Sequence, residues 1–339
     1  AMTAVLGSGW EKFVSPSFVS ARAVRLCDRW ATAREDVARI AHGYEVTGDF
    51  HGVGEEVARQ AEWQAARKPE LAERLAQIAA DARDKTAGEF EGQVAVITGV
   101  TPNSIAGAAA GRLLAGGATV IITASRIDTA RLSFAKELYR THARAASELW
   151  MVPANLASFR DVDALVEWIG SEQRETVGAT SKLIKPALVP DLLLPFAAPP
   201  VRGSLADAGP ETENQARLLL WSVERLLGSL AQLGAEHDVA HRLHSILPGS
   251  PNRGTFGGDG AYGEVKAAFD AIMNKWRVEP WGERTSLVQA KIGWVRGTGL
   301  MGRNDPLVAA VEAEGVRTWS TAEMGEQLVA LCSAETRAA

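Results

Sequence analysis

Residues 93–126, QVAVITGVTPNSIAGAAAGRLLAGGATVIITASR, decide the fold of this chain. Residues 93–98 form a short apolar, β-branched run, which is typical of a buried parallel strand. Gly99 follows at once, where the chain must turn sharply, and Ser104 stands where it can cap a helix of small residues. Glycines end that helix before a second strand at 118–123. The stretch predicts a strand, a tight turn, a helix and a second strand of an α/β sheet.

The tight turn is a candidate phosphate site. The first amides of a helix have no acceptor within the helix, and behind a glycine turn they can bind an anion. Asn103 and Ala106 stand where a dinucleotide-binding fingerprint usually carries glycines. An α/β unit that binds no ligand is therefore the alternative for this stretch taken alone.

The end of the second predicted strand indicates which dinucleotide would bind. Folds that select NAD usually carry an acid there, which accepts hydrogen bonds from the ribose 2′-hydroxyl. This chain has Ser125 and Arg126 instead, and a guanidinium makes bidentate, charge-assisted contacts with a 2′-phosphate. The prediction is NADPH, and an ordinary solvated arginine is the alternative.

A second constellation lies at 249–270, GSPNRGTFGGDGAYGEVKAAFD. Ser250 precedes Tyr262 by twelve residues and Lys266 follows it by four, so Tyr262 and Lys266 share one face of a helix. An ammonium beside a phenol favours the phenolate, which predicts a lowered pKa for Tyr262. The Ser250 hydroxyl would hold a substrate carbonyl oxygen while Tyr262 protonates it. An amphipathic helix with an incidental tyrosine–lysine pair is the alternative.

The rest of the chain indicates an α/β domain behind a helical extension. Strand and helix patterns alternate from residue 91 onward, which is typical of a doubly wound parallel sheet, or Rossmann-like fold. The further predicted strands are 148–153, 191–196, 243–248 and 285–292, the main helices are 159–172, 211–233 and 261–277, and 174–190 is an insertion. Residues 20–86 are charged, helical in pattern and without strand-like alternation. We expect a helical N-terminal region over 1–90, a hinge at 85–92 and an NADPH-binding domain over 91–339.

Composition favours a soluble, cytoplasmic enzyme. Of 339 residues 46% are hydrophobic, yet no apolar run is long enough to span a membrane and no signal peptide is evident. The two cysteines, Cys27 and Cys332, are too few and too far apart for a disulfide scaffold. His237, His241 and His244 are expected at the surface or half-buried rather than as metal ligands. The net charge of −5 argues against nucleic acid as the main partner.

Together these features resemble the short-chain dehydrogenase/reductases. Several segments look like one branch of them, the β-ketoacyl reductase region of the type I fatty acid synthases of fungi and actinobacteria. They include TGVTPNSIAGAAAGRLLAGGATVIITASR, LPGSPNRGTFGGDGAYGEVKAAFD and IGWVRGTGLMGRNDPL. The motifs SPN-x-G-x-F-G-x-DG-x-Y and IGW-x-RGTGLM within them are the most specific, and the resemblance covers about residues 92–332. It implies a module of a longer polypeptide that reduces a 3-oxoacyl thioester with NADPH and takes its substrate from an acyl carrier protein.

The resemblance also implies roles for individual residues. Tyr262 would protonate the forming alkoxide, Lys266 would lower the pKa of Tyr262 and hold the nicotinamide ribose, and Ser250 would bind the substrate oxygen. Cofactor contacts are implied at Gly99, Ser104 and Ile105 (pyrophosphate), Ser125 and Arg126 (2′-phosphate), Asn155 and Leu156 (adenine), Ala197 (ribose), and Gly293 and Thr298 (nicotinamide).

Two points remain open in the sequence. Ser222 stands where the family often has an asparagine that anchors a water chain to the catalytic lysine, and a serine bonded to its own helix backbone is the alternative. The candidates for a basic patch that docks the carrier protein are Lys182, Lys185, Arg296 and Arg303, with solvated surface charge as the alternative. A free-standing ketone reductase and a catalytically silent structural module are the alternatives for the whole chain.

Overall fold

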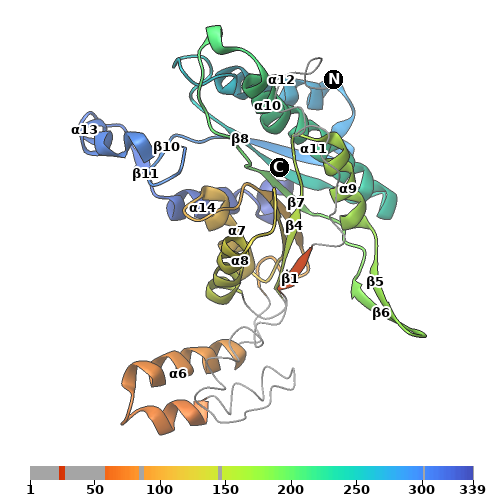
Figure 1. Ribbon diagram of the computed structural model, residues 1–339, viewed down its shortest axis with the longest axis vertical. Helices are drawn as coiled ribbons and strands as arrows, with labels where there is room; N and C mark the ends of the chain where they lie inside the picture. Colours follow the sequence, from red (N-terminus) through yellow and green to blue (C-terminus); the bar gives the residue numbers. More distant parts are fainter. Residues whose placement is uncertain (1–22, 27–57, 84–87, 144–146, 301, 339) are drawn as a thin grey trace.

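The computed structural model describes residues 23–26, 58–83, 88–143, 147–300 and 302–338. Its centre is a seven-stranded sheet (Figure 1). In spatial order the strands are β1 (Val24–Leu26), β4 (Glu148–Pro153), β3 (Thr119–Ala124), β2 (Val94–Thr98), β7 (Leu192–Pro195), β8 (Leu243–Gly249) and β9 (Thr285–Lys291). All neighbours are parallel except β1, which runs antiparallel to β4. The predicted doubly wound sheet is confirmed, and the strand order reverses between β2 and β7, where such sheets bind ligands.

Helices cover both faces of the sheet, each over its own apolar core. Side chains of α7 (Ile105–Ala115), α8 (Thr129–His142) and α14 (Thr321–Ala330) pack into one core. Those of α9 (Phe159–Gly170), α11 (Ser222–His237) and α12 (Tyr262–Val278) pack into the other. α10 (Pro210–Ala216) runs into α11 through a π-helical turn, η2 (Arg217–Trp221). Every predicted strand and main helix from residue 91 onward is present within a few residues of its expected bounds.

Smaller elements complete the structure outside the sheet and its main helices. They are α6 (Pro69–Arg83), η1 (Leu205–Asp207), η3 (Trp281–Glu283), η4 (Gly302–Leu307), α13 (Val308–Ala313), α15 (Ala334–Ala338) and the short pair β10 (Trp294–Val295) and β11 (Thr318–Trp319). In Figure 1, α6 lies apart from the sheet, at the opposite end from α10 and α12. None of the helices that the structure describes is both long and apolar enough to cross a bilayer.

Strand β1 contradicts the expectation that residues 20–86 contain no strand. Residues 58–64 and α6 are helical as predicted, but Val24–Leu26 pairs with β4 at the sheet edge. Arg25 holds this pairing, because its guanidinium contacts the Glu148 carboxylate and stacks 5.3 Å from the centre of the Trp150 ring. Three residues are too few for an alternating pattern to be recognised. The helices expected over 1–22 and 27–57, and residues 84–87 of the hinge, lie outside the described residues.

The insertion at 174–190 forms a β-hairpin, β5 (Gln173–Val177) and β6 (Thr180–Lys185). Lys185, predicted as a surface cation, is instead fully buried. Its Nζ donates to the carbonyls of Ile169, Ser171 and Pro186 at 3.0, 2.8 and 2.7 Å. The end of α9 leaves carbonyls without intrahelical donors, and the lysine satisfies them. The prediction that Lys185 belongs to a docking patch is therefore wrong.

Two other sequence expectations concern His244 and Cys332. His244 is 1% exposed, so its expected half-buried position is wrong. Its Nδ1 lies 2.7 Å from Ser286 Oγ and its Nε2 lies 3.0 Å from the Leu331 carbonyl, which ties β8 to the segment after α14. Cys332 is buried with a free thiol, and Cys27 lies outside the described residues.

Candidate active site

The structure brings the three predicted catalytic side chains together where β8 ends and α12 begins. Ser250 follows the last residue of β8, and its side chain lies close enough to Tyr262, the first residue of α12, to lower the pKa of the phenol. Lys266 lies one turn further along α12 and is 4% exposed. Its Nζ donates to the Pro248 carbonyl at 2.6 Å and lies 5.3 Å from the centre of the Tyr262 ring. A phenol, a hydroxyl and an amine thus share one site.

The electrostatics of this site differ from the expectation. Burial raises the pKa of Tyr262, the hydrogen bond with Ser250 lowers it, and the negative charge of Asp259 raises it. Burial also lowers the pKa of Lys266 to about 7. The prediction that Lys266 lowers the pKa of Tyr262 is therefore wrong. The Lys266 side chain is bonded to the Pro248 carbonyl, and burial disfavours the charged form of the lysine.

The loop between Ser250 and Tyr262 is held by two side chains that the sequence analysis did not single out. Asn252 Nδ2 donates to Asp259 Oδ2 at 2.9 Å, and the Asn252 amide donates to Ser250 Oγ at 3.1 Å. Asp259 Oδ2 also accepts from the Gly263 amide at 3.0 Å in the first turn of α12. Both residues lie within the SPN…DG motif, but their spacing alone carries no chemical signal. They fix the loop that joins the hydroxyl to the phenol.

Gly99 and Ala197 meet at the ends of β2 and β7, where the strand order reverses and a ligand crevice is expected. Gly99 has φ +77°, and a Cβ there would lie 2.6 Å from the Ala197 nitrogen, so only glycine fits. The Ala197 amide donates to Thr98 Oγ1 at 3.0 Å, which joins the two strand ends. A ligand at this crevice would meet backbone from both strands.

The turn after β2 presents free amides at the start of α7. Ser104 caps the helix, because its Oγ accepts from the amides of Gly107 at 2.9 Å and Thr101 at 3.1 Å. Asn103 has φ 57°, so this asparagine takes the left-handed conformation that a glycine usually supplies. The amides of Ile105 and Ala106 have no acceptor within the described part of the chain. The altered fingerprint therefore still forms a tight turn with free amides at the helix start, which is the arrangement that can bind an anion.

Ser125 and Arg126 lie exposed beyond the end of β3. The Arg126 side chain is 72% exposed, and its Nε donates to Asp128 Oδ2 at 3.0 Å. The two Nη groups have no partner among the described residues, which leaves a bidentate face open to solvent. This donor set fits a phosphate ester.

Asn155 and Leu156 follow β4 at the same edge of the sheet. Leu156 is buried, and Asn155 Oδ1 accepts from the Ala157 amide at 3.1 Å. The Asn155 amide donates at 2.8 Å to Asp161 Oδ2, whose partner oxygen Oδ1 is buried without a hydrogen-bond donor. Burial raises the pKa of Asp161. The Asp161 carboxylate thus fixes the Asn155 backbone after the end of β4.

The two remaining cofactor candidates follow β9. The Ile292 amide donates to the Gly249 carbonyl at 3.1 Å, so Gly293 lies beside the segment that carries Ser250, and space is open around its Cα. Thr298 is buried, and its Oγ1 donates to the Val295 carbonyl at 3.3 Å within its own turn. Free amides, an exposed guanidinium and a glycine-lined crevice along one edge of the sheet together fit NADPH.

Ser222 does not point toward a proton relay. Its Oγ donates to the Leu218 carbonyl at 2.7 Å, across the π-helical turn that precedes α11. The backbone-bonded alternative for this serine is therefore confirmed. π-Helical turns inside longer helices often lie at functional sites.

The other proposed docking cations have separate environments. Lys182 is exposed on β6, whereas Arg296 lies 3.6 Å from Glu312 and 3.7 Å from Glu323. The side chain of Arg303 lies outside the described residues.

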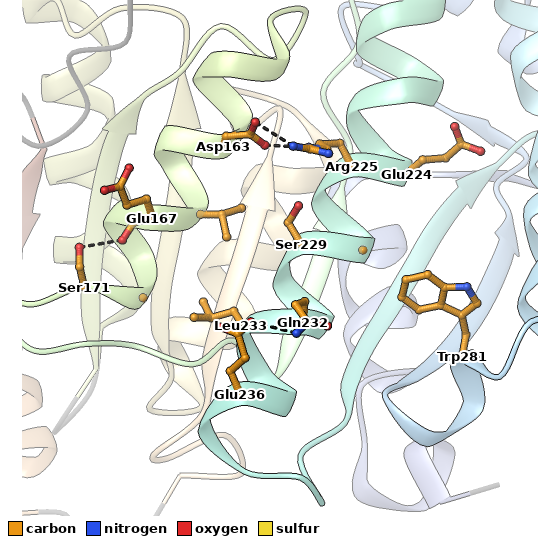
Figure 2. A pocket seen from close by; sticks show the side chains of 13 residues that line it. Asp163, Glu167, Ser171, Glu224, Arg225, Ser229, Gln232, Leu233, Glu236 and Trp281 are labelled. Carbon is orange, nitrogen blue, oxygen red and sulfur yellow. Dashed lines mark hydrogen bonds and ion pairs between the residues drawn. The ribbon is translucent and has the colours of Figure 1, made fainter.

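A surface groove of about 670 Å³ lies between α9 and α11 (Figure 2). Figure 2 shows Asp163 of α9 and Arg225 of α11 paired across it, with Trp281 at one end. None of the predicted catalytic or cofactor residues lines it.

Comparison with known proteins agrees with this geometry. No protein-family model matches the chain. A fatty acid synthase subunit alpha of Cochliobolus carbonum is 36% identical over 244 residues, which cover 71% of this chain but only 15% of that protein. An angucycline C-6 ketoreductase with bound NADP superposes with a TM-score of 0.58 at 18% identity, covering 75% of this chain and 93% of the ketoreductase.

A second solved structure has the same fold. The 3-oxoacyl-(acyl-carrier-protein) reductase of Agrobacterium tumefaciens C58, with NADP bound, superposes with a TM-score of 0.54 at 20% identity and covers 73% of this chain and 89% of the reductase. The chain has the fold of the short-chain dehydrogenase/reductases, and most of its sequence is related to one segment of the fatty acid synthase alpha subunits.

Proposed function

We propose that this chain is an NADPH-dependent 3-oxoacyl-[acyl carrier protein] reductase, acting as one module of a type I fatty acid synthase. It converts the ketone of a β-keto thioester to the 3-hydroxyacyl thioester. The observation that carries the proposal is the meeting of Ser250, Tyr262 and the buried Lys266 where β8 ends and α12 begins, with Lys266 Nζ 5.3 Å from the centre of the Tyr262 ring. This trio adjoins a crevice whose amides and guanidinium fit NADPH.

The chemistry divides between the cofactor and the protein. NADPH, when bound, supplies the hydride that adds to C3 of the substrate. Tyr262 transfers its phenolic proton to the ketone oxygen, and Ser250 Oγ donates a hydrogen bond to the same oxygen. The raised pKa of Tyr262 suits this role, because the phenol remains protonated at neutral pH until negative charge develops on the substrate.

Lys266 supports the phenolate that forms when the proton leaves. Its Nζ is fixed by the Pro248 carbonyl, and a new negative charge on Tyr262 favours the ammonium form of the lysine. The low pKa of Lys266 in the free site therefore allows its charge to respond to the reaction. Proton relay through the Ser222 side chain is not part of this proposal.

The proposed partner is an acyl carrier protein, and the proposed location is the cytoplasm. The chain is net acidic at −5, so a similarly acidic carrier needs local rather than overall charge complementarity. Exposed Lys182 remains the candidate contact among the described residues. Lys182→Glu that left turnover of carrier-bound substrate unchanged would remove this contact from the proposal.

The test of the function is NADPH oxidation with acetoacetyl-CoA, compared with NADH. Tyr262→Phe keeps the ring but removes the acid, and we expect at least about a hundredfold loss of kcat with NADPH affinity retained. Tyr139→Phe is a matched control, because Tyr139 is buried in α8 and its hydroxyl bonds to the Ser147 carbonyl. We expect that control to turn over like the wild type.

Each alternative function predicts a different experimental result. A wild-type protein that fails to bind NADPH in a fluorescence titration would contradict the proposal and favour a structural module. A strong preference for small free ketones over carrier-bound acyl chains would favour a free-standing reductase.

A further inference from the structure

One buried side chain outside the catalytic trio touches both loops around the site. Gln215, at the end of α10, is 1% exposed. Its Nε2 donates to the carbonyls of Pro200 at 3.1 Å and Arg202 at 3.3 Å. Its Oε1 accepts from the amide of Ala261 at 2.6 Å. A single amide group thus links the loop after β7 to the residue that precedes Tyr262.

The two loops also meet directly, in a way that leaves room for this glutamine. The Gly260 amide donates to the Gly203 carbonyl at 2.7 Å, and Gly203 and Asp259 form a parallel bridge. Gly260 has φ +62°, and a Cβ there would collide with Gln215 Oε1. Glycine is required at 260 both for the backbone conformation and for the close approach of the glutamine.

The contact with Ala261 fixes where α12 begins. Ala261 is the N-cap residue of α12, and its backbone amide donates to Gln215 Oε1, which ties the start of the helix to the glutamine. The next residue is Tyr262, whose closeness to Ser250 requires the first turn of α12 to hold its position. On its other side, Gln215 continues through η2 into α11, which packs against the sheet core. The glutamine therefore ties the phenol to a rigid part of the fold.

We infer that Gln215 is a positioning residue, which holds the 200–203 loop and the first turn of α12 in register so that Tyr262 faces Ser250. The catalytic consequence rests on the proposed function, whereas the register itself is a property of the free protein. Displacement of a reacting group by about 1 Å can cost a hundredfold in rate, so loss of the register should lower kcat. NADPH affinity should change little, because Gln215 contacts none of the cofactor candidates.

The test uses Gln215→Met, which keeps the length of the side chain and removes its hydrogen bonds, and Gln215→Glu, which keeps an acceptor for Ala261 but loses both donations. Gln232→Met is the matched control, since Gln232 is exposed on the same continuous helical stretch. Hydrogen exchange of the free proteins reports on 200–203 and 259–263. Steady-state kinetics and NADPH titration report on the site.

For Gln215→Met we expect at least about tenfold faster exchange in both segments, a fall of about ten- to a hundredfold in kcat, and NADPH affinity within about twofold of wild type. Gln215→Glu should keep more protection at 259–263 than Gln215→Met, while 200–203 loosens in both. Exchange and kcat like those of the wild type in Gln215→Met would overturn the inference. A wild-type protein without turnover would refute the proposed function instead, and the exchange data would still decide the register.

Discussion

Replacement of Lys266 by methionine should make the protein more stable near pH 6 while it abolishes turnover. The lysine is 4% exposed, and burial lowers its pKa from 10.5 to about 7. Well below pH 7 the folded protein must hold a buried ammonium that the unfolded chain keeps in water. A pKa difference of this size corresponds to about 5 kcal/mol at 1.36 kcal/mol per pH unit. Methionine carries no such cost.

The gain is partly offset by the lost hydrogen bond to Pro248. A buried carbonyl left without its donor costs about 1–3 kcal/mol. The net stabilisation of Lys266→Met near pH 6 is therefore about 3 kcal/mol, which corresponds to a rise in Tm of roughly 6–12 °C for a domain of this size. Buried charges are often replaced by apolar residues with a gain in stability.

The pH dependence of the stability difference identifies the buried charge of Lys266 as its cause. Between pH 7 and about 10.5 the unfolded chain binds one more proton at Lys266 than the folded chain, so the free energy of unfolding of the wild type rises with pH relative to the variant. The advantage of Lys266→Met should shrink from pH 6 to pH 9 and then reverse.

Thermal unfolding of both proteins across this range measures the effect, with Lys275→Met as the control on the exposed face of α12. A variant less stable than wild type at pH 6, or a difference that does not change with pH, would refute the reasoning.

Three further predictions concern the cofactor edge and the core. Arg126→Glu should weaken NADPH binding at least about tenfold and NADH binding much less, by fluorescence titration; equal losses would contradict the 2′-phosphate assignment. Burial lowers the His244 pKa to about 4, so the unfolded chain binds a proton more readily than the folded chain in acid. In urea unfolding between pH 7 and pH 5, the free energy of unfolding of the wild type should therefore fall by about 2 kcal/mol more than that of His244→Phe; parallel losses would contradict this. Lys185→Met should cost about 2–4 kcal/mol by removing three buried hydrogen bonds, to the carbonyls of Ile169, Ser171 and Pro186, whereas the exposed Lys182→Met should change little; equal melting temperatures would contradict this role of Lys185.

The sheet and the meeting of Ser250, Tyr262 and Lys266 could be predicted from the sequence because both depend on short-range patterns. Apolar runs of five or six residues between turn signals locate buried parallel strands, and a tyrosine–lysine spacing of four fixes a shared helix face whatever surrounds it. Ser104 as a helix cap follows from the same local logic. The position of the site could be predicted because residues that follow parallel strands lie together at one edge of the sheet.

Features that depend on distant contacts could not be predicted. Lys185 was expected at the surface because lysines usually are, and only the fold places the Ile169 and Ser171 carbonyls of the α9 end beside it. Gln215 carries no signal in the sequence, because its three partners come from two other loops. The pKa of Tyr262 was expected to fall because the sequence spacing reveals the neighbouring amine of Lys266. The spacing does not reveal burial, which raises the pKa of Tyr262 and lowers the pKa of Lys266.

The pairing of β1 with β4 bears on how this protein can be handled. A version that began at residue 91, where the helix and strand alternation starts, would lack Val24–Leu26 and leave one side of β4 without hydrogen-bond partners. Uncovered apolar strands of this kind pair readily with other chains, and Leu149, Met151 and Val152 make β4 strongly apolar. Self-association through that strand would then be a consequence of trimming rather than a property of the native module. A shortened version of this chain should therefore retain the residues that cover β4.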